Sequence, residues 1–275
     1  MKFLSTSGQG KSRRLTIGDL DHALQLCREA RWNQTKDDWR ILLELAPDGC
    51  LAIEVDGNLA ATTTILCHGS RLAWVGMVLT KKEFQERGFA RRLLSEVLTL
   101  AEKKKIDTVK LDATDQGKRL YEKAGFRAEQ PVERWLRAGV DSEIPATNVA
   151  TGEWHRSDRE VFGADRSGLL KKLGERNAVW TSGDSFLLGR SGAETGYLGP
   201  CVSDDPHSAR LLIERFVQST KSAISWDLLP QNQNAVAIAK DLGFVPQRRL
   251  TRMVRGKDLR GKEKSVYALA GFEFG

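Results

Sequence analysis

The sequence has little cysteine and no long apolar run, and these two shortages exclude several classes of protein. Its 275 residues include four cysteines, none of them in a C-x-x-C pair: Cys27, Cys50, Cys67 and Cys201. Their spacing fits neither a zinc site nor a disulfide framework, so we expect reduced thiols and no bound metal. No apolar run approaches membrane-spanning length, and no signal-peptide core precedes Lys11. We therefore expect a cytoplasmic protein without a membrane partner.

A complete nucleotide-binding P-loop is also missing. Gly10-Lys11-Ser12 resembles the end of such a loop, but Ser5 stands where the first glycine belongs. There is also no room before it for the strand that precedes a P-loop. We expect residues 1–14 to form a mostly flexible leader.

What the sequence does have is an excess of positive charge. Its 43 Lys and Arg residues against 36 Asp and Glu give a net charge of +7 and a pI near 9.3. Such a balance suits an anionic ligand or a nucleic acid. The basic residues are scattered among carboxylates, however, which argues against nucleic acid. The length allows one large domain or two small ones.

Periodicity and turn residues predict an alternation of helices and strands in the first half. A helix opened by Thr16 and a second helix from Trp39 precede a β-hairpin that turns at Asp56-Gly57. The further expected elements are a strand over 72–80, a helix from 90, a strand over 106–114, a helix over 117–124 and closing strands over 126–136. This is an α/β (α+β) pattern whose first strands are antiparallel.

The stretch Gln85-Glu86-Arg87-Gly88-Phe89-Ala90 lies between the third strand and the following helix. The first amides of that helix have no partners within it, and the helix dipole favours an anion beside them. Gly88 permits a close backbone approach, and Arg87, Arg91 and Arg92 add positive charge. The spacing is compatible with a phosphate site and also with an ordinary helix start.

This stretch resembles the pyrophosphate loop of the GNAT superfamily of N-acetyltransferases, whose pattern is Q/R-x-x-G-x-G/A. Lys82 departs from the proline that many members have at its position. The resemblance implies that acetyl-CoA is the cosubstrate, with its diphosphate on the loop and its pantetheine arm along a strand that splays from its neighbour. The residues implied in cofactor binding are Val78, Leu79, Thr80, Gln85, Glu86, Arg87, Gly88, Phe89, Ala90 and Arg91.

A second GNAT motif, N-x-x-A-x-x-L-Y-x-x-x-G-F, resembles the segment from Thr114 to Phe126. Thr114 replaces the usual Asn and Gly117 the usual Ala, whereas Tyr121 is retained. The resemblance implies that Thr114 and Tyr121 lie beside the cofactor and that the phenol protonates the departing thiolate. A phenol can do so because it stays protonated at neutral pH. The alternative is an aromatic side chain that only packs on Phe126.

The second half repeats this pattern imperfectly at an offset of about 118 residues. Asn232, Ala235 and Gly243-Phe244 match the second motif, but Ala239 stands at the position of Tyr121. Residues 203–208 replace the phosphate loop with two aspartates and a proline, which would repel a diphosphate. We expect two tandem GNAT-like domains, each with a twisted, mixed, mostly antiparallel sheet flanked by helices. Residues 1–138 would be catalytic and 139–275 degenerate and accessory, joined by a linker over 138–150.

The resemblance implies direct transfer of an acetyl group to a primary amine, most simply that of a small molecule, in a ternary complex. Tyr121 is the expected acid and Asp112, at the end of a strand, the expected base. Glu83, Asp115 and His68 are the other candidate bases. The alternative is a sensor with this fold that binds acetyl-CoA without catalysis. We expect a monomer or a homodimer.

Overall fold

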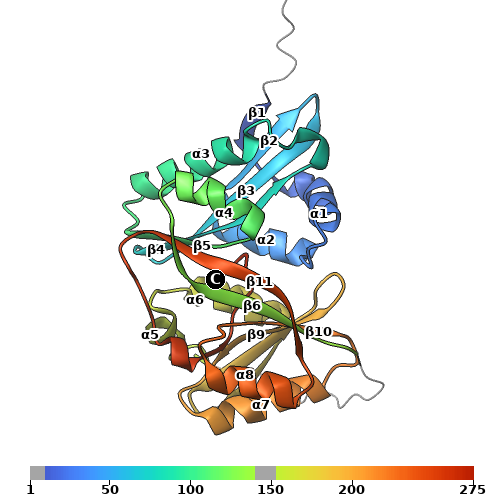
Figure 1. Ribbon diagram of the computed structural model, residues 1–275, viewed down its shortest axis with the longest axis vertical. Coiled ribbons are helices and arrows are strands. Elements are labelled where there is room, and N and C mark those ends of the chain that lie inside the picture. The colour runs from blue at the N-terminus through green and yellow to red at the C-terminus, as the bar shows by residue number, and fades with distance from the viewer. Residues whose placement is uncertain (1–9, 140–152) are drawn as a thin grey trace, which may run out of the picture.

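The computed structural model describes residues 10–139 and 153–275, and both stretches contribute to one continuous sheet. Within them the sheet has 12 strands in the order β1-β2-β3-β4-β5-β11-β6-β10-β9-β8-β7, with β12 beside β9. All strand pairs are antiparallel except β4 with β5 and β9 with β10. Helices flank the sheet in both halves (Figure 1). The expected α/β class and the twisted, mostly antiparallel sheet are confirmed.

The first half contains six strands and four α-helices. They are β1 (Lys11–Arg14), α1 (Leu20–Glu29), α2 (Lys36–Leu45), β2 (Cys50–Val55), β3 (Asn58–His68), β4 (Leu72–Thr80), α3 (Phe89–Lys103), β5 (Thr108–Ala113), α4 (Asp115–Lys123) and β6 (Arg127–Arg137), with short 3-10 turns at Ile17–Asp19 and Lys82–Phe84. Capping boxes at Thr16 and Thr35 begin the first helical segments. Asp56 and Gly57 both adopt positive φ, as the predicted hairpin turn requires.

The second half repeats this order with fewer strands before its long helix. Its elements are α5 (Asp158–Phe162), α6 (Ser167–Arg176), β7 (Ala178–Ser182), β8 (Ser185–Arg190), β9 (Gly196–Val202), α7 (Pro206–Gln218), β10 (Ile224–Leu228), α8 (Gln233–Asp241), β11 (Val245–Gly256), a 3-10 turn at Glu263–Ser265 and β12 (Val266–Ala268). Gly125 and Gly243 both take positive φ where α4 and α8 end, which confirms the repeated Gly-Phe signal.

The two halves exchange their closing strands. β11, from the second half, pairs with β5 from Thr251↔Ala113 to Gly256↔Thr108. β6, from the first half, pairs with β10 through Trp226↔Trp135 and its neighbours. β6 and β11 also pair with each other, and they run side by side between the two halves (Figure 1). The residues over 126–136 thus form a strand, as predicted, but it closes the sheet of the second half.

Alternating side chains of the strands divide the core between the two faces of the sheet. In β3, Ile65 packs in the cluster that includes residues of α3, whereas Leu66 packs in the cluster that includes residues of α1, α2 and α6. α7 and α8 contribute to a third cluster around Trp226. The α6 side chains Leu169 and Leu173 pack in the same cluster as α1 and α2, so the two halves share apolar core as well as strands.

Two expectations about the connecting segments need comment. The predicted flexible leader is wrong over residues 11–14, which form β1 and pair with β2 from Lys11↔Glu54 to Arg14↔Leu51. The predicted linker over 138–150 lies almost entirely outside the described residues. Among the helices that the structure describes, none is long and apolar enough to span a membrane.

Candidate functional site

A wedge opens in the sheet where β4 and β5 diverge. These parallel strands pair only at Leu72↔Thr108, Ala73↔Val109 and Trp74↔Lys110. β4 then continues to Thr80 without a partner on its β5 side. Beyond Trp74, alternate backbone groups of β4 therefore face the wedge with no strand to accept them. A splayed strand is what the family resemblance implies here, and its free edge has the geometry to pair with an extended ligand.

A β-bulge in β4 shapes the wall of the wedge. The register to β3 shifts between Thr62↔Leu79 and Thr64↔Gly76, and Met77 takes a φ of 49°. The Thr62 hydroxyl donates a hydrogen bond of 2.8 Å to the Met77 carbonyl and holds this conformation. Bulges next to a site re-aim side chains. Val78 and Thr80 line the cavity here, whereas the side chain of Leu79 is buried in the core.

The loop after β4 presents the amino terminus of α3 to the wedge. Glu86 and Gly88 have φ of 63° and 82°, and no side chain caps the helix. The side-chain Nε2 of Gln85 donates a hydrogen bond of 3.3 Å to the Thr80 carbonyl and ties the loop to the strand. The first backbone amides of α3 therefore have no capping partner and can donate hydrogen bonds to an anion. Loops of this backbone conformation at a helix amino terminus commonly bind phosphate groups.

The predicted loop residues Gln85 to Arg91 all line the same cavity. Arg87 stacks over the Phe84 ring at 5.2 Å from its centroid. Arg92 does not join them, because its guanidinium donates to the Gly10 carbonyl at 2.7 Å and to Glu96. Two basic side chains of α4, Arg119 and Lys123, line the cavity instead. The basic side chains that line this part of the cavity thus come from the loop before α3, from α3 and from α4.

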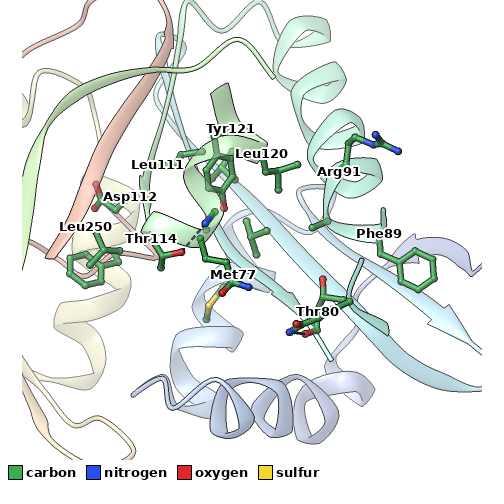
Figure 2. A pocket seen from close by; sticks show the side chains of 18 of the residues that line it. Met77, Thr80, Phe89, Arg91, Leu111, Asp112, Thr114, Leu120, Tyr121 and Leu250 are labelled. Carbon is green, nitrogen blue, oxygen red and sulfur yellow. Dashed lines mark hydrogen bonds between the residues drawn. The ribbon is translucent and has the colours of Figure 1, made fainter. Parts of the chain in front are cut away.

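On α4, Thr114 and Tyr121 both face this cavity. Thr114 is the N-cap, and its hydroxyl accepts a hydrogen bond from the Gly117 amide at 3.1 Å. In Figure 2 the phenolic oxygen of Tyr121 points toward the part of the cavity where Met77 and Thr114 lie. Burial raises the pKa of the phenol above its ordinary value. The Tyr121 ring also packs edge-on against Phe126, as the alternative packing role requires, and this contact leaves its hydroxyl facing the cavity.

The cavity has a volume of about 670 Å³ and draws its walls from both halves. Phe89 and Arg91 lie on one side of it and Asp112 and Leu250 on the other, with Met77 between them (Figure 2). The loop before α2, the exchanged strand β6 and the second half supply side chains that no sequence motif marks: Trp32, Gln34, Arg134, Arg248, Leu250, Phe272 and Glu273. Trp32 and Gln34 reach the cavity from the loop before α2, whereas the strand exchange and the segment after β12 bring the others.

Asp112, the expected base, lines the cavity, and its side chain is fully buried. Both of its oxygens accept hydrogen bonds from Arg252, at 2.9 and 3.0 Å. Burial nevertheless raises the pKa of Asp112, with the Arg252 charge opposing that shift. Glu273 is a second buried carboxylate on the cavity wall, and burial raises its pKa as well. It accepts hydrogen bonds from Arg190 and Gln34.

The other three candidate bases lie outside the cavity. Glu83 pairs with Lys81 at 2.9 Å, and Asp115 is an exposed residue at the start of α4. His68 is buried, and its ring Nε2 donates to the Phe274 carbonyl at 2.8 Å. Burial, followed by the Arg166 charge, lowers the pKa of His68 to about 3. Glu83 and His68 thus make structural contacts, and Asp115 is an acidic residue in the first turn of a helix, where it complements the helix dipole.

The corresponding place in the second half is closed. The Asp205 carboxylate caps α7 by accepting from the His207 and Ser208 amides, and Pro206 lacks an amide hydrogen. The segment 203–205 is also shorter than the loop over 81–88. Beside it, β12 pairs with β9 at Val266↔Val202 and Ala268↔Cys201, so the free edge of β9 is covered.

Comparisons with known proteins agree with this geometry. Two protein-family models, both described as the acetyltransferase (GNAT) domain, match residues 37–140 and 155–268 of this chain. An uncharacterized N-acetyltransferase of Bacillus subtilis, YitH, is 29% identical over 239 residues, which cover 80% of this chain and 83% of that protein.

Solved structures show the same architecture. A protein of Pyrococcus horikoshii, described as a candidate acetyltransferase, superposes with a TM-score of 0.83 at 23% identity, over 100% of this chain and 99% of that one. A tandem GNAT protein from the clavulanic acid biosynthesis pathway superposes with a TM-score of 0.59 at 11% identity, over 90% of this chain and 98% of that one. At these identities the likeness concerns the fold. With a GNAT domain matched in each half, the chain belongs to the GNAT family of acetyltransferases, and it carries two such domains in tandem.

Proposed function

We propose that this protein transfers the acetyl group of acetyl-CoA directly to a primary amine of a small molecule, with both substrates bound at once. The observation that carries the proposal is the uncapped amino terminus of α3, which opens onto the wedge between β4 and β5. A diphosphate fits the helix amino terminus, and an extended arm that contains amide groups fits the wedge between the strands. Acetyl-CoA joins these two chemical features, and it supplies an acetyl thioester.

The chain's own groups would position this substrate in three places. Amides at Phe89, Ala90 and Arg91 would receive the diphosphate, with Arg87 and Arg91 beside it. The free edge of β4 over Val78–Thr80 would hydrogen-bond the arm through its backbone. An amide of the same strand would donate to the thioester carbonyl oxygen as negative charge develops there. Positioning of this kind supplies much of the rate, because amines already react with thioesters.

Tyr121 is the proposed acid. Its phenol faces the middle of the cavity, between the loop over 81–88, here called the cofactor loop, and the residues that the second half contributes to the cavity wall. Because burial raises its pKa, Tyr121 keeps its proton throughout the neutral range. The proton on its Oη would pass to the sulfur as the carbon–sulfur bond breaks, and the phenolate would regain a proton from the acceptor nitrogen, which loses its second proton as the amide forms.

The proposed base is Asp112, which would take a proton from the acceptor's ammonium group so that the amine can attack. Its raised pKa increases its basicity, and one lone pair on each oxygen remains beyond the hydrogen bonds from Arg252. Glu273 is the competing carboxylate, since it lines the same cavity with a pKa raised by the same cause.

The walls of the cavity support a small acceptor. Phe272 and Glu273, from the segment after β12, line the side away from the cofactor loop, and Leu250 of β11 lies beside Asp112 (Figure 2). The Trp74 indole donates to the Phe272 carbonyl at 2.9 Å and fixes this segment against β4. A small amine fits the remaining space better than a protein tail does.

Initial-rate kinetics with acetyl-CoA and a panel of amines test the proposal. Release of free thiol should depend on an amine, its product should carry one acetyl group, and double-reciprocal plots should intersect. Parallel plots, or an acetylated enzyme, would contradict direct transfer. Stabilisation by acetyl-CoA in a melting experiment without thiol release from any amine would instead favour a sensor.

A further inference from the structure

Several arginines lie on or behind the wall of the cavity that is away from the loop over 81–88, and carboxylates of the chain neutralise all but one of those named here. Arg134 forms two hydrogen bonds with Asp227, at 2.7 and 2.6 Å. Behind the wall, Arg190 pairs with Asp38 and Glu273. Arg252 pairs with Asp112. Buried charges are expected to be compensated in this way.

Arg248 is the exception. It is half-buried and lines the cavity, yet within residues 10–139 and 153–275 it has no hydrogen bond or ion pair. Burial lowers its pKa, and the guanidinium of Arg134 lowers it further, whereas the Asp227 carboxylate, which is hydrogen-bonded to Arg134 and not to Arg248, opposes the shift. The pairing of β11 with β6 shifts register between Pro246 and Arg248, so Arg248 lies next to an irregularity in the strand pairing. Bulges beside a site commonly aim a side chain at a ligand.

A second polar group without a hydrogen-bond partner among the described residues lies on the same cavity wall. Gln34 is buried, and its amide nitrogen donates to Glu273 at 2.9 Å and to the Tyr197 hydroxyl at 3.3 Å. Its amide oxygen, by contrast, is buried without a hydrogen-bond partner among the described residues. Arg134, whose charge acts on Arg248, stacks over the Tyr197 ring, so Gln34 and Arg248 belong to one connected wall.

These two groups demand opposite partners. A guanidinium without a carboxylate calls for an anion, which it binds through two parallel hydrogen bonds. An orphaned amide oxygen calls for an N–H donor. We infer that the acceptor is an amine that also carries an anionic group, a carboxylate or a phosphate, and that Arg248 binds that group. The inference rests on the proposed function for the amine, and it adds the class of the acceptor.

The test compares matched acceptors that differ in one charge. β-Alanine with β-alaninamide and glycine with glycinamide report a carboxylate, whereas O-phosphoethanolamine with ethanolamine reports a phosphate. The readout is kcat/KM for thiol release with wild type, Arg248→Gln and Arg248→Lys. Arg249→Gln is the control, because Arg249 is an exposed neighbour in β11 that does not line the cavity.

We expect the wild-type preference for the charged member of at least one pair to fall about ten- to a hundredfold in Arg248→Gln, the range for a charge-assisted contact. Arg248→Lys should recover part of it, and Arg249→Gln should keep all of it. Comparing one ratio between variants cancels the different basicities of the two amines. Whether the carboxylate or the phosphate pair responds identifies the anion. An unchanged ratio in Arg248→Gln, with wild-type melting and acetyl-CoA affinity, would overturn the inference.

Calorimetry separates this inference from the proposed function. The same amines are titrated into the protein in the presence of CoA, so that binding is read without transfer. If no amine is acetylated, the proposed function fails, but the inference still requires that a charged member bind wild type and lose that affinity in Arg248→Gln. Equal binding of charged and neutral members to wild type would contradict it.

Discussion

The amino termini of α3 and α7 occupy equivalent places in the two halves, and they differ in what satisfies their first amides. At α7 the Asp205 side chain accepts from two of them, and Pro206 removes another donor. At α3 there is Gly88 with positive φ and no capping side chain. A capped helix end is complete by itself, whereas an uncapped one needs water or a ligand. We therefore expect a diphosphate to bind at α3 and not at α7.

The wedges beside these helices differ in the same direction. β4 leaves its edge free beyond Trp74, whereas β9 pairs with β12. The Leu269 amide also donates to the Asp227 carbonyl at 2.8 Å, which fastens the filling segment to β10. The chain then continues to Phe272 and Glu273 on the first half's cavity wall. The segment that closes one wedge therefore helps to form the site at the other.

The exchange of β6 and β11 should have the largest effect of any feature tested. A fragment of residues 1–138 lacks β11, so β5 loses its antiparallel partner and Asp112 loses Arg252. We expect this fragment to show no cooperative melting and no stabilisation by acetyl-CoA, and both to return when 139–275 is supplied. A fragment that melts cooperatively and binds acetyl-CoA alone would show that residues 1–138 are an autonomous domain.

Gly88→Glu removes the difference between the amino termini of α3 and α7, because it places a carboxylate at that end of α3. A side chain at φ 82° is strained, and a carboxylate there would repel a diphosphate. We expect affinity for acetyl-CoA to fall by at least about a hundredfold, as for two or more lost charge-assisted contacts. His207→Glu, which places the same charge near α7, should leave that affinity unchanged. Calorimetric titration of both variants gives the answer, and equal losses would contradict the assignment.

Tyr121→Phe tests the difference at the second motif, where Ala239 stands in the later copy. We expect kcat to fall about a hundredfold, within the usual contribution of an acid catalyst, while acetyl-CoA affinity stays constant. The fall should be nearly independent of pH below about 10, because the raised pKa keeps the phenol protonated there. Tyr267→Phe removes a phenol that does not line the cavity and should keep kcat. Full activity of Tyr121→Phe would remove the phenol from the mechanism.

Two Asp–Arg pairs are reciprocal consequences of the strand exchange, and they allow the base to be tested. Asp112 pairs with Arg252, and Asp227 pairs with Arg134. Replacing either aspartate by Asn should lower the free energy of unfolding by about 3–5 kcal/mol, because a buried guanidinium loses its partner. Only Asp112→Asn should also lower kcat, about a hundredfold. If kcat falls in Glu273→Gln and not in Asp112→Asn, Glu273 is the base.

The smallest predicted effect concerns His68, which is buried in the first half, against His207, which is exposed in the second. The pKa of His68 is lowered to about 3 in the folded protein, so below pH 6.5 the unfolded chain takes up a proton that the folded one does not. Stability should therefore fall as pH drops from 6.5 toward 3, with His68 contributing up to about 1.4 kcal/mol per pH unit. Urea unfolding of wild type, His68→Gln and His207→Gln at several pH values measures this, and an unchanged slope in His68→Gln would contradict it.

Local signals allowed much of this structure to be predicted from the sequence. The hairpin at Asp56-Gly57 and the turns at Gly125 and Gly243 depend on residues a few positions apart. The helix expected from Gly117 begins two residues earlier, at Asp115, because Thr114 caps it. The strand exchange could not be predicted. β6 and β11 follow the same Gly-Phe signal, so the pattern does not decide which of them pairs with β5. Arg248 and Glu273 were missed for the same reason, because their positions depend on that pairing and on the segment after β12.

A crystal structure of the chain with CoA tests the central claim most directly. We predict diphosphate density at the amides of residues 88–91, with the arm of the ligand along β4 beyond Trp74 and no ligand between β9 and β10. Density beside Asp205, or a ligand that avoids the amino terminus of α3, would contradict the account.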